Sequence, residues 1–538
     1  MPATERWSSL FVCSLLLLTP LIIFVRHHDY ALLQPEVLLA IFAVAAFGLV
    51  FGCLLLLLPS AARVAIVAAF ALAFIDLQLD FITTGLRALG LYLAAGAALW
   101  PLRLRLGRTL GAACAIMVLT TLPMSPGDGG LRVVESNTAK EDNEGLTPVI
   151  HIILDEHIAI DGIPTEFDPA GTLRKQLEHA YTDLGFHVFT RAFSRHFTTP
   201  PSLSHLVNLS DGANSFEFYD SEQKAVTHNA YFDAMAKRGY QIEVLQTDYI
   251  DFCGSPGAHN ITRCTTYTLE STKAIEASEM PTGAKARAIL GMFGQRSYVL
   301  KEARLAYREA SRELASANIH LPPWPLGAAR MSTVSSMQAL LNVEEDLLSL
   351  RGGSLYFAHI LLPHFSYAYD KTCAMRPSPF EWLTYKAPEL RPTRNNPGTR
   401  AERYPLYLEQ VQCTTRLVTE MLGRVLESEP LRGATVIVHG DHGSRINLTT
   451  PNTPNMHRLG PADFADAFST HFAIRPGAGN GALDRRSIAI DELLSDVVKY
   501  GEPRPGTDWI RSPNVYITGQ RPNEAVARKM MWPTRAPE

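Results

Sequence analysis

Residues 434–443, ATVIVHGDHG, decide the fold of this chain. Their first six residues form a short apolar run, typical of a strand that is buried on both faces. A turn of Gly440, Asp441, His442 and Gly443 follows at once. An earlier stretch, 148–157 (PVIHIILDEH), has the same form and ends on an acidic turn. Because functional groups in such sheets gather at the carboxyl ends of the strands, the two turns predict a shared site.

Other apolar runs bounded by turn residues alternate with helical patterns along the second part of the chain. We predict further strands at 186–190, 241–246, 354–361 and 468–474, and helices at 171–183, 227–238, 284–316, 335–350, 403–429 and 490–500. Strands alternating with helices predict an α/β domain over 147–538, with a mostly parallel central sheet flanked by helices. The polar, Gly- and Asp-rich segment 124–146 is predicted to be a linker.

The first 123 residues are of a different kind, because they contain only five acidic and seven basic side chains. An uncharged apolar run at 9–25 is followed by further apolar runs at 37–58, 64–75, about 84–100 and about 109–123. A cleaved signal peptide does not explain so many runs, although a buried helical bundle remains an alternative. We therefore predict a bundle of about five transmembrane helices, typical of an integral membrane protein.

The arginines predict the orientation of this bundle. With five spans, Arg6, Arg63 and the cluster Arg103, Arg105 and Arg108 lie on one side, which the positive-inside rule assigns to the cytoplasm. Residues 147–538 are then expected on the extracytoplasmic side, the periplasm of a bacterial inner membrane. The net charge of −4 argues against a nucleic-acid partner.

Four cysteines lie in the predicted outer domain: Cys253, Cys264, Cys373 and Cys413. An oxidising compartment permits two disulfides between them, and three pairings exist. We favour Cys253–Cys264 and Cys373–Cys413, since the first pair closes a short loop rich in Gly and Pro. Zinc binding by these thiols is not expected, because no CxxC spacing occurs.

The two acidic turns carry the ligand types of a divalent cation. Asp155, Glu156 and Asp441 offer hard oxygen donors and His442 an imidazole, a set that suits zinc, manganese or calcium. Between the turns lies 195–202, RHFTTPPS, whose hydroxyls would be activated by such a cation. The alternative is that Thr198 or Thr199 only caps the helix that begins near Ser202.

The order of these motifs resembles the sulfatase and alkaline-phosphatase superfamily. The motifs are the acidic turn at 155–157, Thr199-Pro200-Pro201-Ser202, the segment His359–His364 (HILLPH), and Asp441-His442-Gly443. Five spans in front of such a domain look most like the phosphoethanolamine transferases and, more loosely, lipoteichoic-acid-synthase-like phosphoglycerol transferases. The transferases usually show Gly-Glu-Ser where this chain has Asp155-Glu156-His157, so which acid binds metal stays open.

The resemblance implies a role for each matching residue. Thr199 would be the nucleophile, with Thr198 as fallback. The remaining roles are implied as follows: Glu156 or Asp155 as the first metal ligand, Asp161 as a following acid, Asp441 and His442 as the other ligands, His364 as the contact to the phosphoryl group, and His359 and His457 as substrate-facing histidines. His151, His196, His205, His439 and His471 are interpreted as structural.

The predicted function is metal-dependent transfer of a phospho-group, phosphoethanolamine- or phosphoglycerol-like, from a membrane lipid to an envelope lipid or glycan. Zinc is the expected cofactor. The first alternative is a membrane-anchored hydrolase of sulfuric or phosphoric esters, although the formylglycine mechanism is not expected because no Arg follows the nucleophile in the required context. The second alternative is a non-catalytic envelope protein that keeps the fold.

Overall fold

The structure of the chain is a computed structural model. It describes residues 3–28, 30–59, 61–67, 69, 86–102, 106–121, 131–135, 145–254, 261–269, 271–296, 331–376, 382, 395–477, 479–503, 513–519 and 524–533, with short pieces between 305 and 321.

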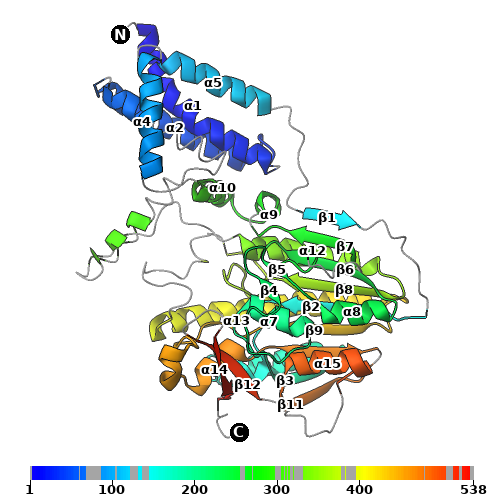
Figure 1. The fold of residues 1–538 in the computed structure, drawn as a ribbon. Helices are drawn as coiled ribbons and strands as arrows, with labels where there is room; N and C mark the ends of the chain where they lie inside the picture. The colour runs from blue at the N-terminus through cyan, green and yellow to red at the C-terminus, as the bar shows by residue number, and fades with distance from the viewer. Residues whose placement is uncertain are drawn as a thin grey trace.

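A nine-stranded sheet forms the centre of the second domain (Figure 1). The strand order is β1 (Leu131–Glu135), β7 (Ile261–Tyr267), β6 (Gln241–Thr247), β8 (Ser354–Ile360), β2 (Val149–Leu154), β9 (Thr435–Gly440), β10 (Phe472–Pro476), β3 (His187–Phe193) and β11 (Ala482–Ala489). The five strands from β7 to β9 are mutually parallel, whereas β10 runs antiparallel to both of its neighbours. The prediction of an α/β domain with a mostly parallel sheet is confirmed.

The register of the three central strands aligns the ends that carry the predicted site. Ile153 of β2 lies opposite His359 of β8 on one side and His439 of β9 on the other. Two residues further on, Asp155 and Asp441 follow at equivalent positions. Because side chains alternate between the two faces of a strand, these two residues start on the same face.

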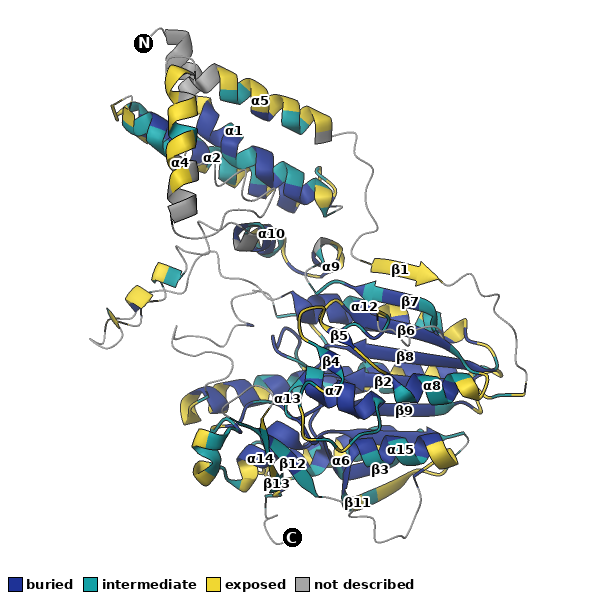
Figure 2. Ribbon diagram, in the orientation of Figure 1, coloured by how far each residue is buried: buried dark blue, intermediate teal, exposed yellow. Residues whose placement is uncertain are grey.

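Helices cover both faces of the sheet. One face packs on α6 (Thr172–Thr182), α12 (Ser332–Leu348) and α13 (Pro397–Glu427), and takes Ile150 and Ile152 of β2. The other face packs on α7 (Thr199–Val207), α8 (Ala230–Lys237) and α15 (Ile490–Tyr500), and takes Val149 and Ile153. Figure 2 shows the central strands of the sheet and the inner sides of these helices as buried, whereas the edge strand β1 is exposed. The alternation explains why β2 reads as one continuous apolar run.

The smaller elements of this domain lie at its rim. They are the 3-10 helices η2 (Ile160–Gly162) and η4 (Thr453–Arg458), the helix α14 (Pro461–Phe468), the strand pair β4 (Tyr219–Asp220) and β5 (Ala225–Val226), and the hairpin of β12 (Asn514–Thr518) and β13 (Ala525–Lys529). Helix α14 packs Phe464 and Phe468 with Val515 and Ile517 of the hairpin in a small separate cluster.

The N-terminal part is helical. It contains α1 (Ala3–His27), α2 (Pro35–Leu56), α4 (Leu86–Leu99), the short η1 (Trp100–Leu102) and α5 (Leu106–Thr121). Among the described residues, α2 alone is long and apolar enough to cross a membrane, with shorter apolar stretches at Phe11–His27 and Thr109–Thr120. Most of the predicted span 64–75 lies outside the described residues, whereas 84–100 is largely α4, which is shorter than a membrane-spanning helix needs to be. The five-span bundle therefore stays a prediction.

Two helices connect the N-terminal helices to the sheet domain, α9 (Thr272–Ala277) and α10 (Thr282–Arg296) (Figure 1). Phe24 of α1 meets Phe293 of α10 with ring centroids 5.7 Å apart. The Gln34 amide before α2 donates to the Glu276 carboxylate of α9 at 2.8 Å. Leu21, Phe24 and Val37 belong to the same apolar cluster as Ile289 and Met292 of α10.

The structure differs from the sequence prediction mainly at the sheet edges. The predicted linker 124–146 contains β1, which pairs antiparallel with β7 although all its side chains are exposed. Neither β7 nor β11 was predicted, because their sequences, ITRCTTY and ALDRRSIA, are largely polar. Strand β11 is at one edge of the sheet, and β7 lies next to the edge strand β1. The predicted strand 468–474 begins only at Phe472, since Phe468 still belongs to α14. Helix α10 is described to Arg296, and 297–304 lie outside the described residues. Residues 305–307, 309–311 and 313–314 are again helical, so the predicted helix 284–316 is borne out where it is described.

Both favoured disulfides are present. Cys253 pairs with Cys264 of β7, and Cys373 pairs with Cys413 of α13. The first closes a loop of 11 residues and the second a loop of 40 residues. The prediction of the pairing is confirmed.

Candidate active site

Three chain segments meet at the carboxyl ends of β2 and β9. The turns after these strands carry Asp155 and Asp441, and the start of α7 carries Thr199. The Glu156 and His442 backbone N–H groups both donate to Asp441 Oδ1, at 3.0 and 2.9 Å. These bonds join the two turns and hold the Asp441 carboxylate in one orientation.

Thr199 lies at the centre of the site and is buried. Its Oγ1 donates to Asp155 Oδ2 at 3.2 Å and is also 3.2 Å from His442 Nε2. Thr198 is the N-cap residue of α7, with an extended backbone and no side-chain capping bond. Pro200 and Pro201 follow in the first turn, as expected from the sequence. The contacts therefore single out Thr199 rather than the fallback Thr198.

His442 turns its Nε2 toward the site. Its Nδ1 is 3.0 Å from the Gly443 carbonyl oxygen, to which an Nδ1–H can donate. Nε2 is 3.2 Å from both Asp441 Oδ2 and Thr199 Oγ1. A histidine whose other nitrogen donates to a backbone carbonyl is the usual form of a metal ligand.

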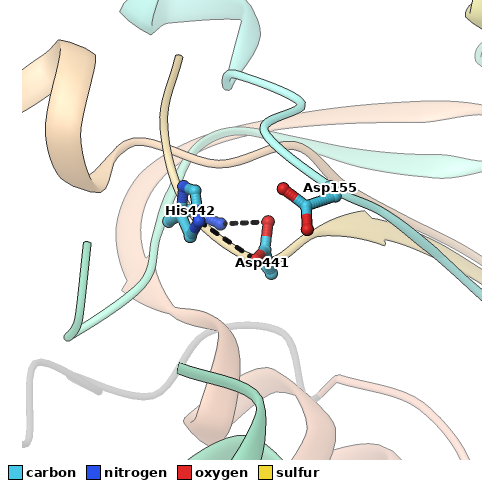
Figure 3. A group of neighbouring side chains, drawn as sticks. All are labelled: Asp155, Asp441 and His442. Carbon is cyan, nitrogen blue, oxygen red and sulfur yellow. Dashed lines mark hydrogen bonds and ion pairs between the residues drawn. The ribbon is translucent and has the colours of Figure 1, made fainter. Parts of the chain in front are cut away.

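Asp155, Asp441 and His442 form a set that could hold a cation (Figure 3). One ligand atom from each lies within 4.8 Å of the others, and all three side chains are fully buried. Among the described residues, no hydrogen bond reaches Asp155 Oδ1 or Asp441 Oδ2. Buried carboxylate oxygens without donors are costly, and a divalent cation would satisfy them. The residues present thus fit a metal such as zinc.

Glu156 belongs to a second, adjoining group. Its Oε1 is 3.5 Å from His364 Nε2 and 3.6 Å from an Arg445 Nη1. Asp155, Glu156 and His364 also have ligand atoms within 4.8 Å of one another. The sequence left open which acid joins Asp441 and His442; the structure groups Asp155 with them, whereas Glu156 lies against His364 and Arg445. Alternation along β2 accounts for this, since neighbouring residues start on opposite faces.

The Glu156 backbone is held in an unusual conformation. Its φ is 62°, in the left-handed region, which costs a residue other than Gly about 1 kcal/mol or more. The Tyr407 hydroxyl of α13 donates to the Glu156 carbonyl at 2.5 Å and accepts from the Ile158 N–H at 3.0 Å. This buried tyrosine fixes the turn between the two groups.

His364 is held by two buried polar side chains that the sequence reading did not identify. Gln410 of α13 donates to the carbonyl oxygens of Pro363, His364 and Ser366 at 3.1 to 3.2 Å, and its own oxygen accepts from Tyr369 N–H. The Thr333 hydroxyl of α12 donates to the Ser366 carbonyl at 2.6 Å. These bonds fix the loop that places His364 beside Glu156. A single Gln within a helix belongs to no recognisable sequence motif, so the sequence alone does not indicate the supporting role of Gln410.

The other predicted site residues lie at different distances from this centre. His359 is buried on β8 with Nε2 3.4 Å from Asp155 Oδ2. Asp161 lies apart in an ion pair with Arg191 at 3.0 Å and accepts a hydrogen bond from Thr190. His457 is exposed on η4, and no described contact joins it to Asp155 or Thr199, so its role as a substrate-facing residue stays a prediction.

Burial and mutual repulsion shift the two acids in opposite directions. Burial, and next the Asp441 charge, raise the pKa of Asp155 to about 7. Burial also acts to raise the pKa of Asp441, but His442, His359 and the Glu156 N–H outweigh it, and the pKa of Asp441 is lowered. Burial lowers the pKa of His359 to about 4. The two acids thus differ in environment although both are fully buried.

The chain matches no known family profile and no curated protein sequence. One similar solved structure is the C-terminal periplasmic domain of EcEptC from Escherichia coli, which has also been determined as a complex with Zn. The first of these two structures is 13% identical to this chain, and the match covers 72% of this chain and 93% of that domain with a TM-score of 0.39. Another is a protein in the alkaline phosphatase superfamily from Vibrio parahaemolyticus, at 10% identity, 70% and 74% coverage, and a TM-score of 0.39.

A third similar structure is the phosphonate monoester hydrolase SpPMH from Silicibacter pomeroyi, at 13% identity, 69% and 79% coverage, and a TM-score of 0.35.

Proposed function

We propose that this protein is a membrane-anchored, metal-dependent phosphotransferase that uses Thr199 as its nucleophile. One observation carries the proposal: the buried Thr199 hydroxyl lies 3.2 Å from both Asp155 Oδ2 and His442 Nε2, beside two carboxylate oxygens that accept no hydrogen bond within the described part of the chain. A hydroxyl next to such ligands is the arrangement that metal-assisted nucleophilic catalysis requires.

Asp155, Asp441 and His442 would hold the cation. When bound, it would lower the pKa of the Thr199 hydroxyl and offset negative charge on the transferred group. Thr199 O–H donates to Asp155 Oδ2, so this carboxylate lies where the hydroxyl proton leaves. The Thr199 oxygen would then form a bond to phosphorus as the bond from phosphorus to the leaving alcohol breaks.

His364 would serve the leaving group. It is 18% exposed, whereas the metal-binding side chains are fully buried, so it lies between the centre and solvent. Protonated on both nitrogens, it would donate a proton to the departing oxygen. In the second half of the reaction an acceptor hydroxyl would attack phosphorus, the bond to Thr199 would break, and Thr199 would regain its proton.

A lipid donor is supported by the anchor. The apolar helix α2 packs on α10, which lies next to the sheet domain. An enzyme held at a bilayer meets lipid substrates at high local concentration. The two disulfides favour an oxidising compartment such as the periplasm. We therefore propose a membrane phospholipid as donor and an envelope lipid or glycan as acceptor.

Intact-mass analysis of the purified full chain tests the proposal. After incubation with zinc and vesicles of a head-group-labelled phospholipid, we expect a labelled adduct that peptide mapping assigns to Thr199. Chelation of the metal and the substitution Thr199→Ala should each abolish it, and an added acceptor should take the label. Release of the label only to water would support the hydrolase alternative. Turnover that is unchanged in Thr199→Ala would refute the nucleophile.

A further inference from the structure

Arg445 occupies a constrained position on the loop that carries two of the metal-binding residues. It follows Asp441-His442-Gly443-Ser444, and its φ of 55° lies in the left-handed region. Its N–H donates to the Asp466 carbonyl of α14 at 2.8 Å, and its own carbonyl accepts from the Asn395 amide at 3.3 Å. A residue other than Gly keeps such a strained backbone conformation only where neighbouring groups hold it there. At Arg445, the two hydrogen bonds to its backbone hold this conformation.

Within the described part of the chain, the Arg445 guanidinium has room for a further partner. Its one ion pair there is with Glu156 Oε1 at 3.6 Å, too long for a hydrogen bond. No hydrogen bond within that part of the chain uses any of its five N–H donors. The side chain is 31% exposed, whereas Glu156 is 4% exposed. Arg445 therefore lies at the open side of a buried acidic centre.

The start of α7 offers a transferred group fewer backbone donors than a helix N-terminus usually does. A helix N-terminus normally offers backbone N–H groups to an anion. Here Pro200 and Pro201 have none, and the Ser202 N–H donates to the Thr198 carbonyl. Donors for the oxygens of a group bonded to Thr199 must come largely from side chains. Arg445 and His364 both contact Glu156 Oε1 and are both partly exposed.

We infer that Arg445 is a substrate-binding residue that receives the non-bridging oxygens of the transferred tetrahedral group. This inference rests on the proposed function and adds to it the substrate class: anionic esters with two or more free oxygens, hence phosphodiesters rather than neutral triesters. The planar guanidinium matches two such oxygens, which an ammonium group does not. The competing explanation is that Arg445 only balances the charge of Glu156.

Variants of the full chain separate the two explanations. With zinc and bis(4-nitrophenyl) phosphate as probe, Arg445→Ala should lower kcat/KM about 100-fold and Arg445→Lys about 10-fold, as expected when a charged donor to the transition state is lost. Millimolar guanidinium should restore part of the activity of Arg445→Ala. The matched control Arg416→Ala changes an exposed arginine of α13 and should leave turnover unchanged.

The double variant Arg445→Ala/Glu156→Gln decides between substrate binding and charge balance. If Arg445 binds substrate, removing the Glu156 charge leaves the loss in place. Recovery of activity in the double variant, or full activity of Arg445→Ala alone, would overturn the inference. Thermal melting checks that the variants are folded. If Arg445→Ala does not fold, Arg445→Lys replaces it in the test.

Binding of inorganic phosphate to the zinc-loaded protein, followed by calorimetry, tests Arg445 independently of turnover. We expect the Kd to rise at least 10-fold in Arg445→Ala. A wild-type protein that neither turns over esters nor forms an adduct refutes the proposed function, while a phosphate Kd that depends on Arg445 would still support this residue as an anion ligand. An unchanged phosphate Kd in Arg445→Ala would refute Arg445 whatever the activity.

Discussion

Two places along the same pair of strands bury ionisable side chains in opposite ways. Inside the sheet, His151 of β2 and His439 of β9 face each other with Nε2 atoms 2.7 Å apart. Their outer nitrogens meet the Tyr231 hydroxyl at 3.2 Å and the Gly440 carbonyl at 2.6 Å. Every ring nitrogen of this pair has a partner. At the strand ends, Asp155 and Asp441 each keep an oxygen without a donor in the described structure.

The difference shows that burial alone does not identify a site. Burial lowers the pKa of His439 to about 4 and that of His151 well below its ordinary value, so the pair is neutral and self-contained. Burial raises the pKa of Asp155 to about 7, and the negative charge of the neighbouring Asp441 carboxylate adds to this increase. A buried pair whose polar atoms all have hydrogen-bond partners is structural, whereas a buried pair of carboxylates that repel each other needs a cation to balance its charge.

The largest effect is expected at Thr199. Thr199→Ala should reduce transfer at least about 1,000-fold, because the covalent route is lost. Thr198→Ala is the matched control, since that side chain makes no capping bond, and should change activity less than about 5-fold. The measurement is label transfer from phospholipid vesicles. Equal losses in the two variants would mean that the helix start, not one hydroxyl, matters.

Substitution at the strand end and inside the strand should separate metal binding from stability. Asp441→Asn should lower zinc affinity and activity by about 100-fold or more, because one charged ligand is lost. His151→Gln should keep one zinc per chain but lower the melting temperature, because His439 loses its partner at a cost of about 1–3 kcal/mol. Zinc content and thermal melting measure both. Loss of zinc from His151→Gln would contradict the division between the two places.

Acid should destabilise the domain. Burial lowers the pKa of six fully or almost fully buried histidines, which are His157, His359 and His439 (each to about 4), His196 (to about 3), and His151 and His471. Below pH 6.5 the unfolded chain binds protons that the folded chain does not, so stability is lost as pH falls, by at most about 1.4 kcal/mol per pH unit for each group.

The raised pKa of Asp155 acts in the opposite direction. Its contribution to stability is present below pH 4 and is lost as pH rises toward about 7. The histidines outnumber it, so zinc-free protein should melt at a lower temperature at pH 5.5 than at pH 7.5. Asp155→Asn should steepen this acid sensitivity. A melting temperature that is higher at pH 5.5 would show that the buried histidines do not dominate.

The smallest effect concerns the support of His364. Gln410→Ala should lower kcat about 10-fold, because the loop at 363–366 loses three hydrogen bonds from a buried amide. The same change in a His364→Ala background should have little further effect on kcat, which a purely structural role would not produce. Gln412→Ala is the matched control, since that amide bonds only within its own helix, to the Leu408 carbonyl.

The sequence identified the central strands because apolar runs such as VIHIIL end abruptly in acidic turns. It favoured both disulfide pairings, the first because that pair closes a short loop. It gave Thr199 only through the resemblance of 199–202 to a family motif, and the nucleophile stays a proposal. It could not choose between Asp155 and Glu156, because the choice depends on the register that sets Asp155 opposite Asp441. It missed Arg445, whose direction depends on Asp466 and Asn395, both remote along the chain. The sequence did not predict the outer strands, because their pairing depends on backbone hydrogen bonds more than on apolar side chains.

The packing of α1 and α2 on α10 has a practical consequence. Phe24 and Val37 cover the same apolar cluster as Ile289 and Met292, and Gln34 binds Glu276. A protein truncated to begin at β1 would expose the apolar surface of α10 to water, and it would tend to self-associate or require detergent. Under the proposed membrane anchoring, the same contacts would set the height of Thr199 above the lipid head groups, and substrates would be selected partly by how far they project from the bilayer.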